Sequence, residues 1–219
     1  MNIITEKYHE AVDRLPSSGK HIIAHQTENS LVVYQAFKPS IALFAVKNQK
    51  FGGSDYNFNR MTWIKPNFLW MMYRSGWASK VGQERILAIT ISKSSFNEIL
   101  NGAVVSSYDP EYFPNREEWE KEIKNSDVRL QWDPDHDPFG DKIERRAIQL
   151  GLRGNSQKKF NDEQIEKIED ITDFVVSQGQ LVIANKLNKL EVPYEAVYLP
   201  TDEKLIEKIK IDKIERPIE

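Results

Sequence analysis

The hydrophobic positions of the chain fall into short runs, some alternating like strands and others spaced like helices. Two β-rich runs, His21–Gln26 and Leu31–Phe37, flank a polar stretch and predict two adjacent strands. Met61–Ile64 predicts a short strand, and Arg85–Ile91 is apolar enough to indicate a strand buried on both faces. Two further strands are expected at Val128–Trp132, where Asp-Pro turns follow, and at Ala147–Leu152.

Apolar residues at helical spacing predict helices between these strands. One helix is expected to open at Lys65-Pro66, because proline is tolerated in a first turn, and to run to about Ser75, where Gly76 stops it. Phe51–Asn59, rich in Gly, Asn and Asp, is predicted as a loop. The other predicted helices are Thr5–Leu15, Pro39–Lys47, Ser94–Asn101, Arg116–Lys124, one or two within Phe174–Leu190, and one around Leu205–Ile209 before a frayed tail.

This mixture predicts a single α+β domain over residues 1–219, with a mixed or antiparallel sheet and flanking helices. A chain of 219 residues can bury a substantial core without disulfides. There is no internal repeat and no low-complexity linker. Residues 174–219 are predicted as a helical extension of a core at about 21–173.

Composition narrows the classes of function. The chain has no cysteine, which excludes a thiolate nucleophile and a cysteine-based metal site, and we predict a cytoplasmic protein. No segment has the length of apolar residues needed to span a membrane, so no membrane partner is expected. A net charge of −3 argues against a broad surface for duplex DNA but leaves room for a local basic pocket.

Three tryptophans, Trp63, Trp70 and Trp77, recur at a spacing of seven in the central segment. On a helix, Trp70 would share one face with Tyr73, Arg74 and Trp77. Aromatic residues at this spacing usually pack in a core, so core packing and a ligand-stacking role are both open.

The same segment concentrates positive charge with only one acid, Glu84, to neutralise it. Buried cations need partners, and arginine offers a planar fork that suits phosphate. A neighbouring tryptophan or tyrosine offers a face on which a base can stack. These residues predict a nucleotide or single-stranded nucleic acid as partner, with a structural salt-bridge network as the alternative. The cations are Arg60, Lys65, Arg74, Lys80 and Arg85.

The block RMTWIKPNFLWMMYRSGW, followed by GQERILAI, with VVYQAF upstream and LQWDPDHD and IQLGL downstream, resembles the bacterial and fungal family called domain of unknown function 4291. The likeness runs from about His21 to about Asp173. The family name implies no activity.

The order of elements is also similar to the NAD-binding half of ADP-ribosyltransferases. That resemblance implies NAD as cofactor, with His25 or Tyr34 on an early strand, the stretch Trp63–Tyr73 next, and Glu84 as the acid that promotes transfer. It is a likeness of architecture, without a spacing motif.

Other candidate sites are weaker. Asp133–Glu144 carries acids at the spacing of an EF-hand calcium loop, but Pro138 occupies the position that needs glycine, so no metal is predicted. Lys65 could act as a nucleophile only if burial lowered its pKa. Gln35 could hydrogen-bond a base or an amide, or satisfy backbone groups instead.

The sequence thus favours an enzyme acting on a nucleotide or nucleic acid, with ADP-ribosyl transfer from NAD as its most concrete form. Arg60, Trp63, Lys65, Arg74, Lys80 and Arg85 would build the pocket. A non-catalytic module that binds RNA or a nucleotide, and a protein-interaction domain that uses its tryptophans, are the alternatives.

Overall fold

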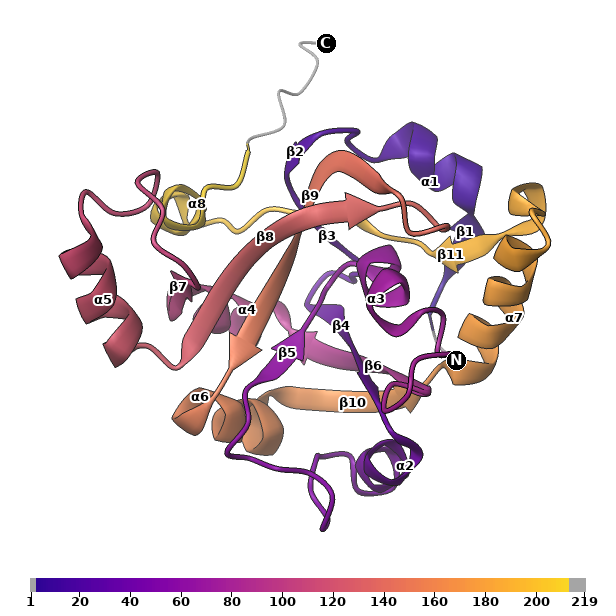
Figure 1. The fold of residues 1–219 in the computed structure, drawn as a ribbon, viewed down its shortest axis with the longest axis horizontal. Coiled ribbons are helices and arrows are strands. Elements are labelled where there is room, and N and C mark those ends of the chain that lie inside the picture. The colour runs from indigo at the N-terminus through magenta and orange to yellow at the C-terminus, as the bar shows by residue number, and fades with distance from the viewer. Residues whose placement is uncertain (1–2, 213–219) are drawn as a thin grey trace.

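Two sheets that diverge from each other carry the fold of residues 3–212, which is the part of the chain that the computed structural model describes (Figure 1). The first sheet is antiparallel, and its middle strand bonds to both neighbours along its length. In spatial order its strands are β10 (Ile165–Asp170), β6 (Arg85–Ser92) and β4 (Ser30–Phe37). Gln26, two residues beyond β3 (Ile22–Ala24), bridges to Leu31 of β4, and β12 (Ala196–Tyr198) pairs with β3.

The second sheet is mixed and is built around a long antiparallel pair, β8 (Val128–His136) and β9 (Lys142–Leu152). Its remaining strands are β7 (Ala103–Val105), parallel to β8, β2 (Gly19–Lys20), parallel to β9, and β5 (Thr62–Ile64), antiparallel to β9. A separate pair joins β1 (Thr5–Lys7) to β11 (Glu191–Pro193). The predicted α+β class with mixed and antiparallel pairing is therefore confirmed.

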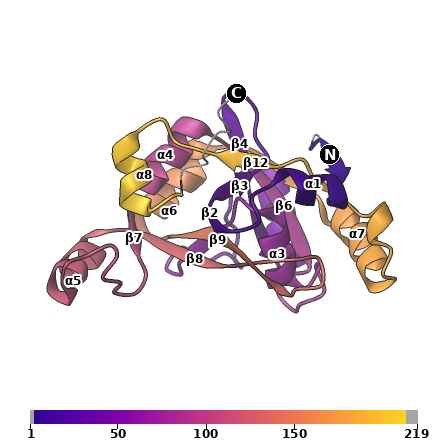
Figure 2. The same ribbon diagram turned by 90° about the horizontal axis from the view of Figure 1, so that it is seen from above.

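Helices cover the faces and ends of these sheets, with α5 and α7 at opposite ends of the molecule in both views (Figures 1 and 2). In chain order they are α1 (Tyr8–Arg14), α2 (Pro39–Asn48), α3 (Phe68–Ser75), α4 (Lys93–Asn101), α5 (Arg116–Asn125), α6 (Gly154–Lys159), α7 (Thr172–Ile183) and α8 (Glu203–Ile209). A π-helical turn follows α6 at Phe160–Gln164, and a 3-10 turn at Leu187–Lys189 precedes β11.

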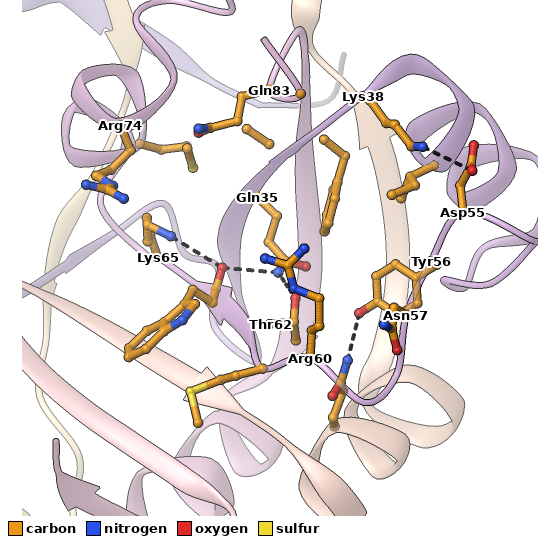
Figure 3. A pocket seen from close by; sticks show the side chains of 18 residues that line it. Gln35, Lys38, Asp55, Tyr56, Asn57, Arg60, Thr62, Lys65, Arg74 and Gln83 are labelled. Carbon is orange, nitrogen blue, oxygen red and sulfur yellow. Dashed lines mark hydrogen bonds and ion pairs between the residues drawn. The ribbon is translucent and has the colours of Figure 1, made fainter. Parts of the chain in front are cut away.

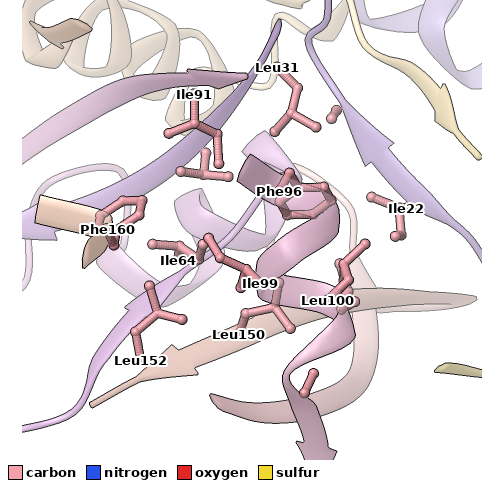
Figure 4. Packing of buried hydrophobic residues seen from close by; sticks show 14 of the residues in the cluster. Ile22, Leu31, Ile64, Ile91, Phe96, Ile99, Leu100, Leu150, Leu152 and Phe160 are labelled. Atoms are coloured by element: carbon pink, nitrogen blue, oxygen red, sulfur yellow. The ribbon is translucent and has the colours of Figure 1, made fainter. Parts of the chain in front are cut away.

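The first sheet is buried on both faces, which explains the continuous apolar run of β6. On one face Leu87, Ile89 and Ile91 join the larger core with α4 and the second sheet (Figure 4). On the other face Ile86 and Ala88 join a smaller core with α3 and α7. A strand that buries both faces cannot alternate apolar and polar residues.

Most predicted elements are confirmed, although the pattern did not predict β2, β7, β10 or α6. Three predicted segments differ from the structure. The helix predicted to open at Lys65-Pro66 starts two residues later, because Asn67 caps it by accepting from the backbone N–H of Trp70 at 2.7 Å. Of the two Asp-Pro turns predicted after Trp132, Asp137-Pro138 is confirmed in the turn of the β8–β9 hairpin. The other is wrong, because Asp133-Pro134 lies within β8, which continues to His136 with a register shift after Pro134. Thr5–Leu15 is not one helix, because its first residues form β1.

Residues 174–219, predicted as a helical extension, contribute strands as well as helices. β11 pairs with β1, and β12 pairs with β3 inside the domain. The tail expected after α8 lies outside the described residues.

The close approach of β5 to β9 generates a first prediction. A Cβ atom on Gly151 would lie 3.0 Å from the ring of Trp63 and 2.5 Å from Sδ of Met61. Gly151→Ala should therefore lower the free energy of unfolding by about 1–3 kcal/mol, as overpacking does. Denaturant titration measures this. Gly102→Ala is the control, because its Cβ would meet its nearest neighbour, Val128, only at 3.4 Å. Equal stability of both variants and the wild type would contradict the tight packing of β5 on β9.

Candidate functional site

A cleft of about 580 Å³ opens beside β4 and β5, where the two sheets part (Figure 3). Tyr34 and Lys65 exchange two backbone hydrogen bonds of 2.7 and 3.2 Å, and this bridge joins the sheets at the inner end of the cleft. Beyond the bridge, β4 continues along one wall and the 55–63 segment forms the other. Five of the residues singled out from the sequence line this cleft: Gln35, Arg60, Trp63, Lys65 and Arg74.

Lys65 is the most unusual group in the cleft. Its side chain is 6% exposed, and its Nζ donates to the carbonyl of Trp63 at 3.4 Å. No acid in residues 3–212 forms an ion pair with it. The pKa of Lys65 is lowered to about 7, mainly by burial and also by the positive charge of Arg74, while Asp133 opposes the shift. The amine is therefore partly neutral near pH 7.

Two exposed arginines stand at the mouth of the cleft. Across the described part of the chain, neither Arg60 nor Arg74 takes part in an ion pair or a side-chain hydrogen bond. The other cation of the lining, Lys38, is paired with Asp55 at 3.0 Å. Two positive charges and the partly protonated amine of Lys65 thus face one cleft without an ion-pair partner among the described residues, a distribution that attracts an anion.

Gln35 lies on the floor of the cleft and is 2% exposed. Its Nε2 donates to Oγ1 of Thr62 at 2.6 Å and to the carbonyl of Trp63 at 3.1 Å. Because a carbonyl can only accept, these bonds fix the orientation of the amide. Its Oε1 is buried without a partner among the described residues. A ligand N–H group could satisfy this oxygen.

Aromatic rings complete the lining. Trp63 is half-buried, and its ring lies over Gly151. Tyr56, on the loop after α2, stacks on Phe51 with ring centroids 5.0 Å apart, and burial raises its pKa. The sequence reasoning missed Tyr56 as a cleft residue, because it lies in a polar loop that no strand or helix pattern tied to β4.

The remaining aromatic candidates lie elsewhere. Trp70 and Tyr73 stack with His136, with the rings of Tyr73 and His136 only 3.6 Å apart, so these side chains hold α3 against β8. Tyr34 is fully buried against Phe68, and burial raises its pKa well above the ordinary value. His25 donates from Nδ1 to the carbonyl of Tyr194 at 2.8 Å, since a carbonyl can only accept.

The other charged candidates bond to neighbouring protein groups and do not line the cleft. Lys80 donates to the carbonyls of Tyr73 and Arg74 at the end of α3. Arg85 pairs with Asp170 at 2.7 Å. Glu84 follows cleft residues Gly82 and Gln83 but does not itself line the cleft. One of its oxygens accepts from the N–H of Gly82 at 2.8 Å, and the other is buried without a partner in the described chain.

Residues 21–198 match the family described as Domain of unknown function (DUF4291), so the chain belongs to that family. The match extends beyond Asp173 and includes β12, in agreement with the pairing of that strand inside the domain. A search of curated proteins found no match to the chain.

Residues 3–212 have neither a cluster suited to a metal ion nor a helix able to span a membrane. They contain no group of three or more His, Cys, Asp or Glu side chains placed to hold a metal ion. No helix among them is long and apolar enough to cross a membrane.

Burial of Lys65 predicts a pH-dependent cost in stability. Since the folded-state pKa is lowered from 10.5 to about 7, the unfolded chain binds more protons between these values. Lys65 therefore lowers the free energy of unfolding more and more as pH falls from 10.5 to 7, and this destabilisation is largest below pH 7. Lys65→Met should be more stable than the wild type by a few kcal/mol at pH 6, with a gap that narrows towards pH 9.5. Denaturant titrations at both values measure this gap.

Lys124→Met, on the exposed face of α5, is the control and should change stability little at either pH. A gap between Lys65→Met and the wild type that stays constant from pH 6 to 9.5 would contradict the lowered pKa.

Proposed function

We propose that the cleft binds the phosphate groups of a nucleotide or of a single-stranded nucleic acid end. The observation that carries this proposal is the convergence of Arg60, Lys65 and Arg74 on one cleft without an acidic partner among the described residues. A buried ammonium without a counter-charge is costly. A bound phosphate would supply the missing charge and the missing hydrogen-bond acceptors.

Features around the three cations favour a nucleotide over a bare phosphate. The Oε1 atom of Gln35 is an acceptor that an exocyclic amine of a base, or a carboxamide, could satisfy. Trp63 and Tyr56 present rings to the same cleft, and base stacking on such rings contributes about 1–3 kcal/mol per base. A volume of about 580 Å³ falls within the range of roughly 300–1,000 Å³ typical of small-molecule pockets.

An enzymatic form of this proposal is ADP-ribosyl transfer from NAD. In it the cations would hold the pyrophosphate and the carboxamide of nicotinamide would donate to Gln35. Glu84 follows cleft residue Gln83 and has one buried carboxylate oxygen without a partner among the described residues. In this form of the proposal its side chain would turn into the cleft, orient a ribose hydroxyl and stabilise the oxocarbenium-like transition state. Tyr34 could take no direct part, because its hydroxyl is buried beneath the bridge with Lys65.

Nucleotide binding predicts selective stabilisation of the native protein. Thermal unfolding should shift upwards with at least one of NAD, ATP, ADP-ribose and short single-stranded RNA, as mass action requires of a ligand that binds the folded state. Because phosphate contacts are ionic, the shift should shrink as salt rises from 50 to about 300 mM. No shift at millimolar ligand would exclude the proposal and favour a protein partner for the aromatic residues.

Single substitutions test which cations hold the ligand. Arg60→Ala and Arg74→Ala should each weaken binding of the ligand that stabilises the protein by about tenfold, since charge-assisted hydrogen bonds are among the stronger polar contacts. Both side chains are exposed, so the fold should be retained. Isothermal titration calorimetry gives the affinities. Lys124→Ala changes the net charge equally without touching the cleft, and an equal loss in that variant would indicate a general charge effect.

Glu84→Gln separates an NAD-using enzyme from a binding module. If Glu84 promotes transfer, the variant should keep NAD affinity within about threefold and lose nicotinamide release by at least a hundredfold, as loss of a single electrostatic stabiliser does. Quantification of released nicotinamide by chromatography measures turnover. Turnover that survives this substitution would remove Glu84 from the mechanism. Binding of a nucleotide with no turnover in the wild type would favour the non-catalytic module.

A further inference from the structure

A second cavity, of about 190 Å³, lies on the opposite side of α3 from the cleft. Met71 and Arg74 of that helix line the cleft, whereas Leu69 and the capping residue Asn67 line the cavity. α1, β11 and the end of the β8–β9 hairpin form its other walls (Figure 1). Its walls are mostly apolar, with Ala11, Val12, Leu15, Leu69, Ile143 and Val192 among the lining residues.

Glu195 is the acid that lines this cavity. It is 6% exposed and lies just before β12. Its Oε1 accepts from the backbone N–H of Phe68, in the first turn of α3, at 2.8 Å. No lysine, arginine or histidine of residues 3–212 forms an ion pair with it. A buried carboxylate with one neutral hydrogen bond and no counter-charge is poorly compensated.

The one arginine of the cavity wall is committed to another acid. Arg145 bonds to Asp135 through Nε at 2.8 Å and through Nη2 at 2.7 Å, and its Nη1 donates to the carbonyl of Pro16 at 2.7 Å. If Glu195 is ionised, the buried trio of Asp135, Arg145 and Glu195 therefore carries a net charge of −1. His136 also lines the cavity, and its Nδ1 is buried without a partner among the described residues.

We propose that this cavity is a binding site for a small organic cation, a primary alkylammonium whose charged end pairs with Glu195 and whose short tail packs against α1, Leu69 and Val192. Such a ligand matches both parts of the site. The ammonium supplies the counter-charge that Glu195 lacks, and the tail fills apolar space that water would occupy poorly. The volume is below the roughly 300–1,000 Å³ of pockets for drug-sized ligands, which limits the tail to a few carbons.

A matched set of probes tests this proposal on the full chain. n-Butylammonium should bind saturably and raise the melting temperature, with an affinity at least tenfold higher than that of n-butanol, which has the same tail without the charge. Ammonium chloride, which has the charge without the tail, should also bind at least tenfold more weakly. Comparable binding of butanol would show that the cavity takes apolar groups irrespective of Glu195. No saturable binding of butylammonium at about 50 mM would show that the cavity is not a ligand site. Either result would overturn the proposal.

Two variants locate the binding. Glu195→Gln keeps an oxygen that can accept from Phe68 and removes only the charge, so it should fold and should lose butylammonium binding by at least tenfold. Val12→Trp fills the rim of the cavity from a residue that is 53% exposed, and it should also lose binding without loss of the fold. Retained affinity in both variants would place the amine elsewhere and overturn the proposal.

The pH dependence of butylammonium affinity gives an independent test of Glu195 as the partner. The pKa of Glu195 is raised to about 8, mainly by burial and also by the charges of Asp135 and Glu6, while the hydrogen bond from Phe68 and the charge of Arg145 oppose the rise. The other titratable groups on the wall are Tyr8 and His136. Because an alkylammonium pairs only with the ionised carboxylate, its affinity should rise several-fold from pH 6.5 to 8 and level off above. Glu195→Gln should abolish this dependence. A flat profile in the wild type would remove Glu195 as the partner and overturn the proposal.

Discussion

The bridge between Tyr34 and Lys65 is the contact on which the rest of the structure depends. It ties β4 of one sheet to the segment that follows β5 of the other, and the sheets part from that point. Neighbouring residues along a strand point to opposite faces, so the residues around this bridge divide between two environments. Tyr34 packs into the core beneath α3, whereas Gln35 reaches the cleft. One local pairing thus sets the position of the cleft and the depth of Lys65 within it.

Four buried ionisable groups surround α3, and they are compensated to different degrees. Asp135 and Arg145 compensate each other through two close contacts. Lys65 has a single long hydrogen bond, and Glu195 has one neutral donor from the start of the helix. Removing a charged group from water costs several kcal/mol, which a single neutral hydrogen bond recovers only in part. Folding therefore leaves Lys65 and Glu195, one basic and one acidic, as poorly compensated groups that can gain charge and partners from a ligand in their two cavities.

The sequence predicted the elements better than it predicted the site. The apolar run of Arg85–Ile91 and the helical spacing of Phe68–Ser75 depend on local patterns, and both appear in the structure. The cleft depends on which side of a strand or helix each residue occupies after the sheets assemble. Trp63 and Arg74 reach the cleft, whereas Trp70 stacks on His136. Arg85 is held by Asp170, which lies 85 positions further along the chain. A charge-rich segment shows where cations are concentrated but not which will find acidic partners, because those partners come from distant strands.

The net charge of the chain did not indicate the cleft either, because the charge that lines the cleft is opposite in sign to the net charge. The chain carries −3 overall, yet among the described residues that line the cleft Asp55 is the one acid, and it is taken by Lys38 and Ser40. The local potential is therefore positive inside a protein that is negative as a whole. Salt screens these charges over about 8–10 Å, so a small ligand inside the cleft feels mainly the three cations. A long polyanion would extend beyond these cations over a protein whose net charge is negative. The charge distribution thus favours a nucleotide or a nucleic acid end over an extended duplex.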